Sequence, residues 1–168
     1  MAIPKARGRS PVVVVMGVEG VGKTTVGRRL ADALGVDFVD GDDVHTPEAK
    51  ARMAAGIPLD DAAREPWLDR LDAILRRHQS NGLVLSCSAL KHAYRERLTR
   101  GVAGVVFVAL VAPREVLRER IADRGGHFAG TDLLDSQLAT LELDDGVKTV
   151  DATKPLDKVV AAALSAVG

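Results

Sequence analysis

The stretch Gly17-Val18-Glu19-Gly20-Val21-Gly22-Lys23-Thr24 decides the fold class of this chain. Its glycines let the backbone curl so that successive N–H groups point into one concavity, where phosphate oxygens bind near a helix N-terminus. Lys23 then supplies a positive charge to the β and γ phosphates, and the Thr24 hydroxyl is placed to ligate Mg²⁺. The stretch predicts a phosphate-binding loop (P-loop) and phosphoryl-transfer chemistry.

The residues on both sides of the loop agree with this interpretation. Pro11 to Met16 form a continuous run typical of a strand buried on both faces of a parallel sheet, and Val26, Leu30 and Leu34 follow at helical spacing. The alternative, a tight turn that caps an ordinary helix, would not require a strand running directly into the loop. We therefore expect the nucleotide to be contacted by Gly17, Glu19, Gly20, Val21, Gly22, Lys23, Thr24 and Thr25.

Strand and helix patterns alternate along the rest of the chain. Further strands are expected at Val36–Val39, Leu83–Cys87, Val105–Leu110 and Thr149–Asp151, with segments of helical spacing between them. Such alternation predicts right-handed βαβ units. The expected fold class is therefore a three-layer α/β fold with a five-stranded parallel sheet.

The composition restricts the class of protein. The chain has 168 residues, of which 46% are hydrophobic, and this is enough for one globular domain with a sizeable core. The net charge is zero, and the aromatic residues are one tryptophan, one tyrosine and three phenylalanines. This leaves neither the electrostatic track nor the stacking platforms of a nucleic-acid-binding protein, so we expect a small-molecule substrate.

Cysteine usage and hydropathy bear on the compartment. Cys87 is the single cysteine and cannot form an internal disulfide, and no apolar run reaches the roughly 20 residues of a membrane span. We expect a cytoplasmic protein with no membrane contact. The four histidines have no metal-ligand spacing, so no structural metal is expected.

Three segments stand apart from the alternation. Residues 1–10 are expected to be a disordered tail, and residues 11–168 a single domain. Residues 42–66 and 124–132 are polar and rich in Gly, Pro or His. Irregular insertions on a rigid scaffold often carry substrate contacts, so we expect a substrate-binding insertion at about 42–66 and a lid at about 118–132.

Aspartates follow the second expected strand. Asp40-Gly41-Asp42-Asp43 lies at the carboxyl edge of the sheet, where open α/β folds bind ligands. A kinase acting on a hydroxyl needs one acidic group for the metal shell and one to orient or deprotonate the attacking oxygen. We assign Asp40 to the first role and Asp42 to the second. An acidic turn that only caps the next helix is the alternative.

Two groups of basic residues are candidates for binding anions. Lys91 and Arg95 follow the third expected strand at i, i+4 spacing, which suits an anionic substrate. Arg120 and Arg124 precede two glycines, as expected of a closing lid that brings positive charge onto the transferred phosphoryl group. Ordinary solvated helix faces are the alternative for both groups.

An ordered set of motifs from Val12 to Val160 resembles the gluconokinases of the P-loop kinase superfamily. The motifs are Asp40-Gly41-Asp42-Asp43-Val44-His45, Lys50-Ala51-Arg52-Met53-Ala54-Ala55-Gly56-Ile57-Pro58-Leu59-Asp60-Asp61 with Arg64, Pro66-Trp67-Leu68, Cys87-Ser88-Ala89-Leu90-Lys91 with Tyr94-Arg95, Gly126-His127-Phe128, Leu133-Leu134-Asp135-Ser136-Gln137-Leu138 and Thr140-Leu141-Glu142. The resemblance implies Mg²⁺-dependent transfer of a phosphoryl group from ATP to the 6-hydroxyl of D-gluconate. It also implies an adenylate-kinase-like or shikimate-kinase-like sheet and a homodimer.

The resemblance also implies roles for single residues. Those expected to bind gluconate are Asp42, His45, Arg64, Lys91, Arg95, His127 and Gln137. Arg120 and Arg124 correspond to lid arginines that face the phosphates, and with Lys23 and Asp42 they make up the expected catalytic residues. Lys154 and Pro155 resemble the loop beside the adenine.

The chain departs from the family pattern at a few positions. The family often has asparagine in place of Ala49, acidic residues in place of Ala62 and Ala63, and proline in place of Leu143. These changes leave the nucleotide chemistry intact and bear on substrate specificity. Two other interpretations stay open: a related small-molecule kinase, such as a shikimate kinase, and a nucleotide-binding protein that has lost turnover.

Overall fold

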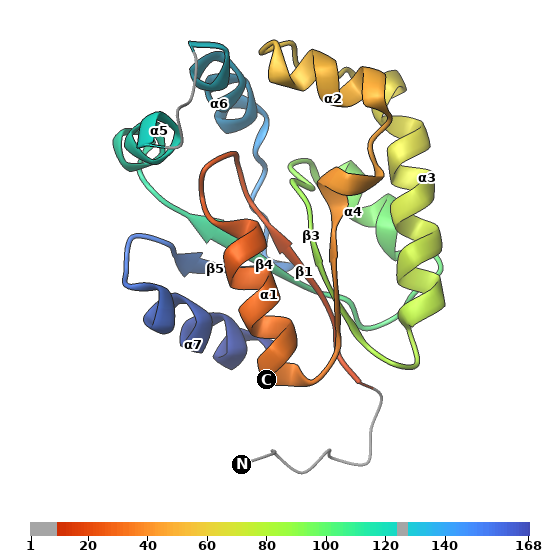
Figure 1. The fold of residues 1–168 in the computed structure, drawn as a ribbon. Helices are drawn as coiled ribbons and strands as arrows, with labels where there is room; N and C mark the ends of the chain where they lie inside the picture. The colour runs from red at the N-terminus through yellow and green to blue at the C-terminus, as the bar shows by residue number, and fades with distance from the viewer. Residues whose placement is uncertain (1–9, 124–127) are drawn as a thin grey trace.

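A five-stranded parallel sheet forms the centre of the protein (Figure 1). The computed structural model describes residues 10–123 and 128–168. The strands are β1 (Val12–Met16), β2 (Asp37–Asp40), β3 (Leu83–Ser86), β4 (Val106–Val111) and β5 (Val147–Asp151). They lie in the order β2-β3-β1-β4-β5, so β1 is central and the loop that follows it emerges in the middle of the sheet.

Strand β1 is apolar throughout because each of its faces packs into a separate core. Val13 and Val15 belong to one hydrophobic cluster, and Val14 and Met16 belong to the other. Alternate side chains of a strand point to opposite faces, so a strand covered on both sides has no polar position. This confirms the predicted three-layer α/β class.

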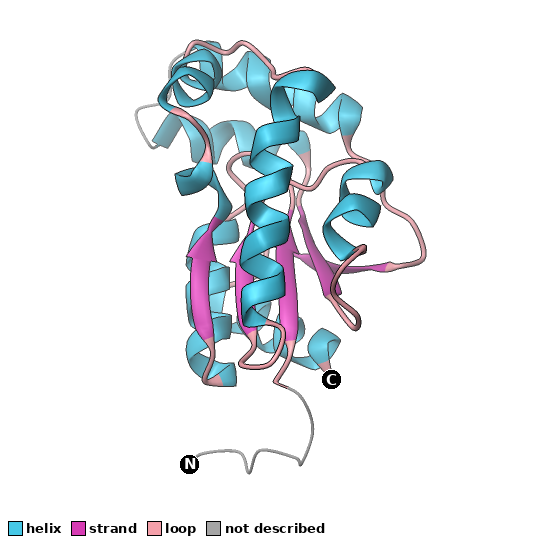
Figure 2. Ribbon diagram, turned by 90° about the vertical axis from the view of Figure 1, so that its right-hand side faces the viewer, coloured by secondary structure: helices cyan, strands magenta, loops and turns pink. Residues whose placement is uncertain are grey.

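Helices cover both faces of the sheet, in front of and behind the strands (Figure 2). The helices are α1 (Lys23–Leu34), α2 (Pro47–Ala54), α3 (Asp61–His78), α4 (His92–Thr99), α5 (Arg114–Asp123), α6 (Phe128–Thr140) and α7 (Leu156–Val167), with a 3₁₀ turn, η1, at Gly41–Val44. Helices α1 and α7 lie together on one face, and α3 and α4 on the other. None of the described helices is both long and apolar enough to cross a membrane.

Helices α2, α5 and α6 gather beyond the end of the sheet from which the P-loop emerges (Figure 1). The prediction that residues 42–66 are irregular is wrong, because this segment contains η1, α2 and the start of α3. The Thr46 side chain caps α2 with Pro47 in its first turn, and the Asp60 side chain caps α3. None of the residues of α2 is buried, so its polar composition concealed a helix.

The strand boundaries differ from the predicted ones by at most two residues. Strand β5 begins at Val147, whereas the sequence suggested Thr149. Only Val147 and Val150 of this edge strand are buried, so its apolar signal is short. The predicted tail at residues 1–10 falls almost entirely outside the described residues.

Candidate active site

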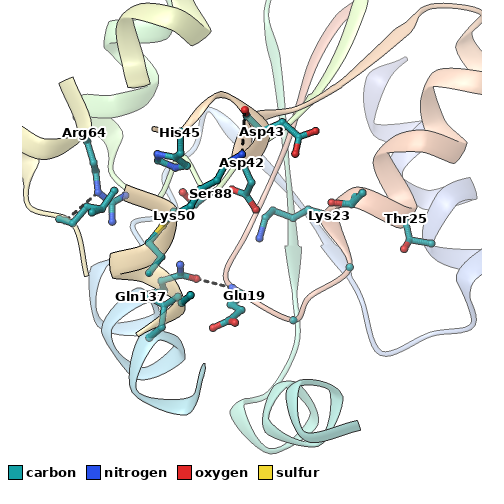
Figure 3. Close-up of a pocket in the computed structure, with 17 residues that line it drawn as sticks. Glu19, Lys23, Thr25, Asp42, Asp43, His45, Lys50, Arg64, Ser88 and Gln137 are labelled. Carbon is teal, nitrogen blue, oxygen red and sulfur yellow. Dashed lines mark hydrogen bonds between the residues drawn. The ribbon is translucent and has the colours of Figure 1, made fainter. Parts of the chain in front are cut away.

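The P-loop connects β1 to α1 and forms one wall of an open cavity of about 510 Å³ (Figure 3). Gly22 is the N-cap of α1 and has φ 100°, a left-handed conformation that favours glycine. The lining residues are Glu19, Gly20, Gly22, Lys23, Thr24, Thr25, Asp42, Asp43, His45, Lys50, Met53, Ala54, Leu59, Arg64, Ser88, Leu133 and Gln137. The cavity thus joins the loop to α2, α3 and α6.

Lys23 lies at the inner wall of the cavity. Its Nζ donates a hydrogen bond to the carbonyl of Val18 at 3.0 Å. Burial lowers the pKa of Lys23 below its usual value, while the carboxylates of Asp42 and Glu19 oppose this shift. The ammonium is therefore held close to the loop backbone, at the place where the loop N–H groups would bind phosphate.

Asp40 ends β2 and contacts the first turn of α1. Its Oδ2 accepts a hydrogen bond from the Thr24 hydroxyl at 3.0 Å, and its Oδ1 accepts one from the backbone N–H of Asp42 at 3.0 Å. The turn after Asp40 packs closely against the end of β3. Gly41 makes this possible, because a Cβ at this position would lie 2.6 Å from the Ser86 carbonyl oxygen. The hydroxyl and carboxylate oxygens fit the hard donor set that Mg²⁺ prefers.

Asp42 follows on the same turn and faces Lys23 across the cavity (Figure 3). The surrounding protein raises the pKa of Asp42 by desolvation, and the Lys23 ammonium opposes this change. A carboxylate in these surroundings is more basic than a fully hydrated one. The arrangement allows Asp42 to accept a proton from a hydroxyl held beside Lys23.

His45 and Arg64 lie at the end of the cavity away from Lys23 and Thr25 (Figure 3). The imidazole of His45 stacks on Trp67, with ring centroids 4.4 Å apart, and the Trp67 indole N–H donates to the Gly41 carbonyl at 2.8 Å. Burial, together with the charge of Arg64, lowers the pKa of His45 to about 4. His45 is therefore neutral at physiological pH and can donate or accept a hydrogen bond.

Arg64 lies in the first turn of α3, and its side chain is held in place by Leu59 and Tyr94. Its Nε donates to the Leu59 carbonyl at 3.2 Å, and its guanidinium lies over the ring of Tyr94 at 5.3 Å from the centroid. The residue is 8% exposed and still lines the cavity. A buried guanidinium with remaining N–H donors is suited to a carboxylate.

Gln137 projects from α6 and contacts the P-loop. Its Oε1 accepts a hydrogen bond from the backbone N–H of Glu19 at 2.6 Å. This N–H belongs to the loop that is expected to cradle phosphate, so Gln137 reaches both the loop and the substrate side of the cavity. The predicted substrate contact of Gln137 stays a prediction.

A second, smaller cavity of about 190 Å³ lies on the other side of the P-loop. It is lined by residues of the loop and α1 together with Arg120, Ala152, Lys154, Leu156 and Val159. Arg120 donates to the carbonyls of Val21, at 3.3 Å, and of Ala152, at 2.6 Å. The predicted adenine-side residue Lys154 therefore lies beside the loop, and Pro155 is the N-cap of α7.

Lys91 and Arg95 do not line the cavity and do not share one helix face, although Lys91 lies over the ring of Tyr94, as Arg64 does. Lys91 precedes α4 in an extended conformation, so the helical i, i+4 geometry does not apply, and its Nζ bonds Asp61 at 3.0 Å. Arg95 is 4% exposed and donates to the carbonyls of Ala89, at 2.7 Å, and Glu142, at 2.7 Å. In this structure both cations hold elements of the protein together.

Some lining residues had no role in the sequence interpretation. Lys50 of α2, Asp43 of η1 and Ser88 after β3 all face the cavity. Each belongs to one of the gluconokinase-like motifs. Asp43 and Ser88 could have been identified because they follow the ends of β2 and β3, and Lys50 because it lies on a polar helix next to the site. The predicted lid residues Arg124 and His127 lie outside the described residues.

The chain is similar to known proteins over most of its length. A family model described as an AAA domain matches residues 12–143. Gluconokinase from Gluconobacter oxydans is 44% identical over 88% of this chain and 86% of its own length. A probable gluconokinase from Xenopus tropicalis is 43% identical over 78% of each chain.

A solved structure gives the same result for the fold. The crystal structure of a gluconokinase from Sinorhizobium meliloti 1021 matches with a TM-score of 0.86 and 41% identity, covering 96% of this chain and 93% of that one. This confirms the predicted P-loop kinase fold. Similarity of this extent in both sequence and structure shows that the chain belongs to the gluconokinase family of P-loop kinases.

Proposed function

We propose that this protein transfers the γ-phosphoryl group of ATP to the 6-hydroxyl of D-gluconate. The observation that carries the proposal is the cavity with Lys23 and Asp42 at the P-loop and with Arg64 and His45 at the other end. Gluconate is a polyhydroxy acid, so its pocket needs hydrogen-bond acceptors for the hydroxyls and cations for the carboxylate. The relatives named gluconokinase support the same substrate.

Residues at different positions along the cavity have different roles in the proposed reaction. The loop amides and Lys23 hold the phosphates, and Asp42 orients the attacking hydroxyl and can accept its proton. Arg120 holds the loop against the segment after β5 and supplies positive charge beside it. Arg64 and His45 hold the far end of the substrate, which sets the distance of the 6-hydroxyl from Lys23.

Thr24 and Asp40 are the residues that would hold Mg²⁺. Their oxygens lie 3.0 Å apart at the start of α1, and the Asp40 carboxylate is oriented by the backbone N–H of Asp42. When bound, the ion neutralises charge on the β and γ phosphates. The homodimer and the cytoplasmic location expected from the sequence stay predictions.

A substrate panel tests the proposal. Initial rates of ADP formation are measured by a coupled assay with ATP, Mg²⁺ and either D-gluconate, shikimate or another sugar acid. We expect kcat/KM for gluconate to exceed kcat/KM for shikimate by at least about 10²-fold. A substrate with a different pattern of polar groups would leave buried polar groups of the site without hydrogen-bond partners. Faster turnover of shikimate, or ATP binding without turnover of any acid, would contradict it.

A further inference from the structure

Lys50 is a cavity residue that the proposed mechanism does not use. It lies on α2, and its side chain extends across the cavity towards η1, where Nζ donates to the Asp43 carbonyl at 3.5 Å (Figure 3). This distance is at the limit of a hydrogen bond, and a lysine ammonium has three N–H donors. Lys50 can therefore exchange this weak contact for a stronger anionic partner.

The charges around Lys50 indicate what that partner is. Arg64 lines the same cavity, and after burial the charges of Arg64, Lys50 and Arg70 lower the pKa of His45. Arg70 does not line the cavity and donates to the Val44 carbonyl, so the cations that face the cavity beside the neutral His45 are Lys50 and Arg64. Lys23 is engaged at the P-loop, where its Nζ donates to the Val18 carbonyl, and the Asp42 carboxylate lies within the field of both Lys23 and Lys50.

The two residues predicted from the sequence to bind the anionic substrate are engaged elsewhere. Arg95 is buried against Ala89 and the segment after α6, and Lys91 pairs with Asp61. Among the described residues that line the cavity, Lys50 and Arg64 are the cations that lie outside the P-loop. They come from α2 and α3 and can hold a carboxylate from two directions.

We infer that Lys50 is a substrate-binding residue that, together with Arg64, holds the carboxylate of the sugar acid and so selects acids over neutral polyols. The inference rests on the proposed function and deepens it. Arg64 is fixed by its contacts with Leu59 and Tyr94, whereas Lys50 lies on a helix without buried residues. Lys50 therefore adds a second cation to the site from α2, which is more exposed than α3.

The test compares the Lys50→Met variant with wild type on two substrates. These are D-gluconate and D-glucitol, the hexitol in which a CH₂OH group replaces the carboxylate. Loss of one charged hydrogen bond should raise KM for gluconate by about 10- to 100-fold. KM for ATP should stay within about twofold of wild type, and so should any turnover of D-glucitol, because neither involves the carboxylate.

Two further variants separate binding from folding. Lys50→Arg keeps the charge and should restore most of the affinity for gluconate. Lys158→Met makes the same chemical change on an exposed helical lysine that lines neither cavity, and it should behave as wild type. Thermal unfolding of all variants shows that they are folded.

The outcomes distinguish the inference from the proposed function. Wild-type turnover of gluconate with an unchanged KM in Lys50→Met overturns the inference alone. A fall in kcat with no change in KM, or an equal loss on gluconate and D-glucitol, also overturns it, because neither result points to the carboxylate. A wild-type protein that does not phosphorylate gluconate contradicts the proposed function and the inference together.

Discussion

At the scale of single residues, Asp42 is the side chain to which we assign the acceptance of the substrate proton. It faces Lys23, and desolvation raises its pKa, as expected of a group that takes a proton during reaction. Replacement by asparagine keeps the shape and removes the basic oxygen. We expect Asp42→Asn to lower kcat on the order of 10²-fold or more while ATP binding, measured by calorimetry, is retained. Turnover equal to that of wild type would exclude Asp42 from the reaction.

His45 makes stability depend on pH in a defined window. In the unfolded chain it takes up a proton near pH 6.5, whereas in the folded protein its pKa is about 4. Between these values the unfolded state binds more protons, so the stabilising contribution is fully present above pH 6.5 and is lost as pH falls towards 4.

The His45→Gln variant isolates this effect. Allowing for partial solvent screening, we expect the free energy of unfolding to fall by about 1–2 kcal/mol more in wild type than in His45→Gln between pH 7 and pH 5. Urea titrations of both proteins at the two pH values give the change in the free energy of unfolding for each. The contributions of the other titrating groups are shared by the two proteins and cancel when these changes are subtracted. An equal fall in both proteins would show that the histidine has an ordinary pKa.

At the scale of elements, Arg95 connects α4 to the segment after α6. Its guanidinium bonds the carbonyls of Ala89 and Glu142 and the carboxylate of Asp144. Removing a buried charge from such a network leaves its partners unsatisfied. We expect Arg95→Met to lower the free energy of unfolding by roughly 2–4 kcal/mol.

Arg97 provides the matched control on the same helix. It pairs with Glu65 and Asp69, whose carboxylates are largely exposed, so Arg97→Met should cost less than about 1 kcal/mol. Urea unfolding compares the two variants. If Arg95→Met were as stable as wild type but had a much higher KM for gluconate, the predicted contact of Arg95 with the substrate would be supported instead.

Arg120 connects α5 to the P-loop and to the segment after β5. It bonds the carbonyls of Val21 and Ala152 beside the smaller cavity. We expect Arg120→Met to raise KM for ATP by about 10-fold, since charge-assisted contacts near the nucleotide are lost. Arg118→Met, an exposed change on the same helix, should have little effect in the same kinetic assay. Equal effects in the two variants would contradict a specific role for Arg120.

The elements with strong periodic signals were predictable from the sequence. Strand β1 and the helix after the P-loop follow directly from their buried apolar residues, and the glycine pattern predicts the loop between them. Helix α2 was not predicted because none of its residues is buried, although Thr46 and Pro47 carry a capping signal. Local periodicity reports burial, so a helix that only covers a cavity gives little signal.

The site was predictable where it lies at a strand end and less so where it depends on tertiary packing. Asp40 ends β2 and Asp42 follows it, and both lie at the start of α1 or at the P-loop, as the parallel topology requires. Lys91 and Arg95 do not share the helix face that their spacing suggested, since Lys91 lies outside α4, and their predicted contact with the substrate stays a prediction. The direction of a side chain depends on whether its residue lies inside the helix. Residue spacing alone does not show that α4 begins after Lys91.

At the scale of the whole molecule, the order of the strands brings distant segments to one place. The central position of β1 places the P-loop between β3 and β4, so α2, α3 and α6 can all contribute to the same cavity. The substrate can be held by α2 and α3 while the nucleotide is held by the loop and the segment after β5. This separation predicts that acid recognition and ATP binding respond to different mutations.

Identification of the product tests the proposed reaction most directly. The purified protein is incubated with ATP, Mg²⁺ and D-gluconate, and the product is examined by ³¹P and ¹³C nuclear magnetic resonance. We expect one new phosphate monoester on carbon 6, formed in equal amount to ADP, and none with Lys23→Met. Phosphorylation at another position, or ADP formation with inorganic phosphate as the only phosphorus product, would contradict it.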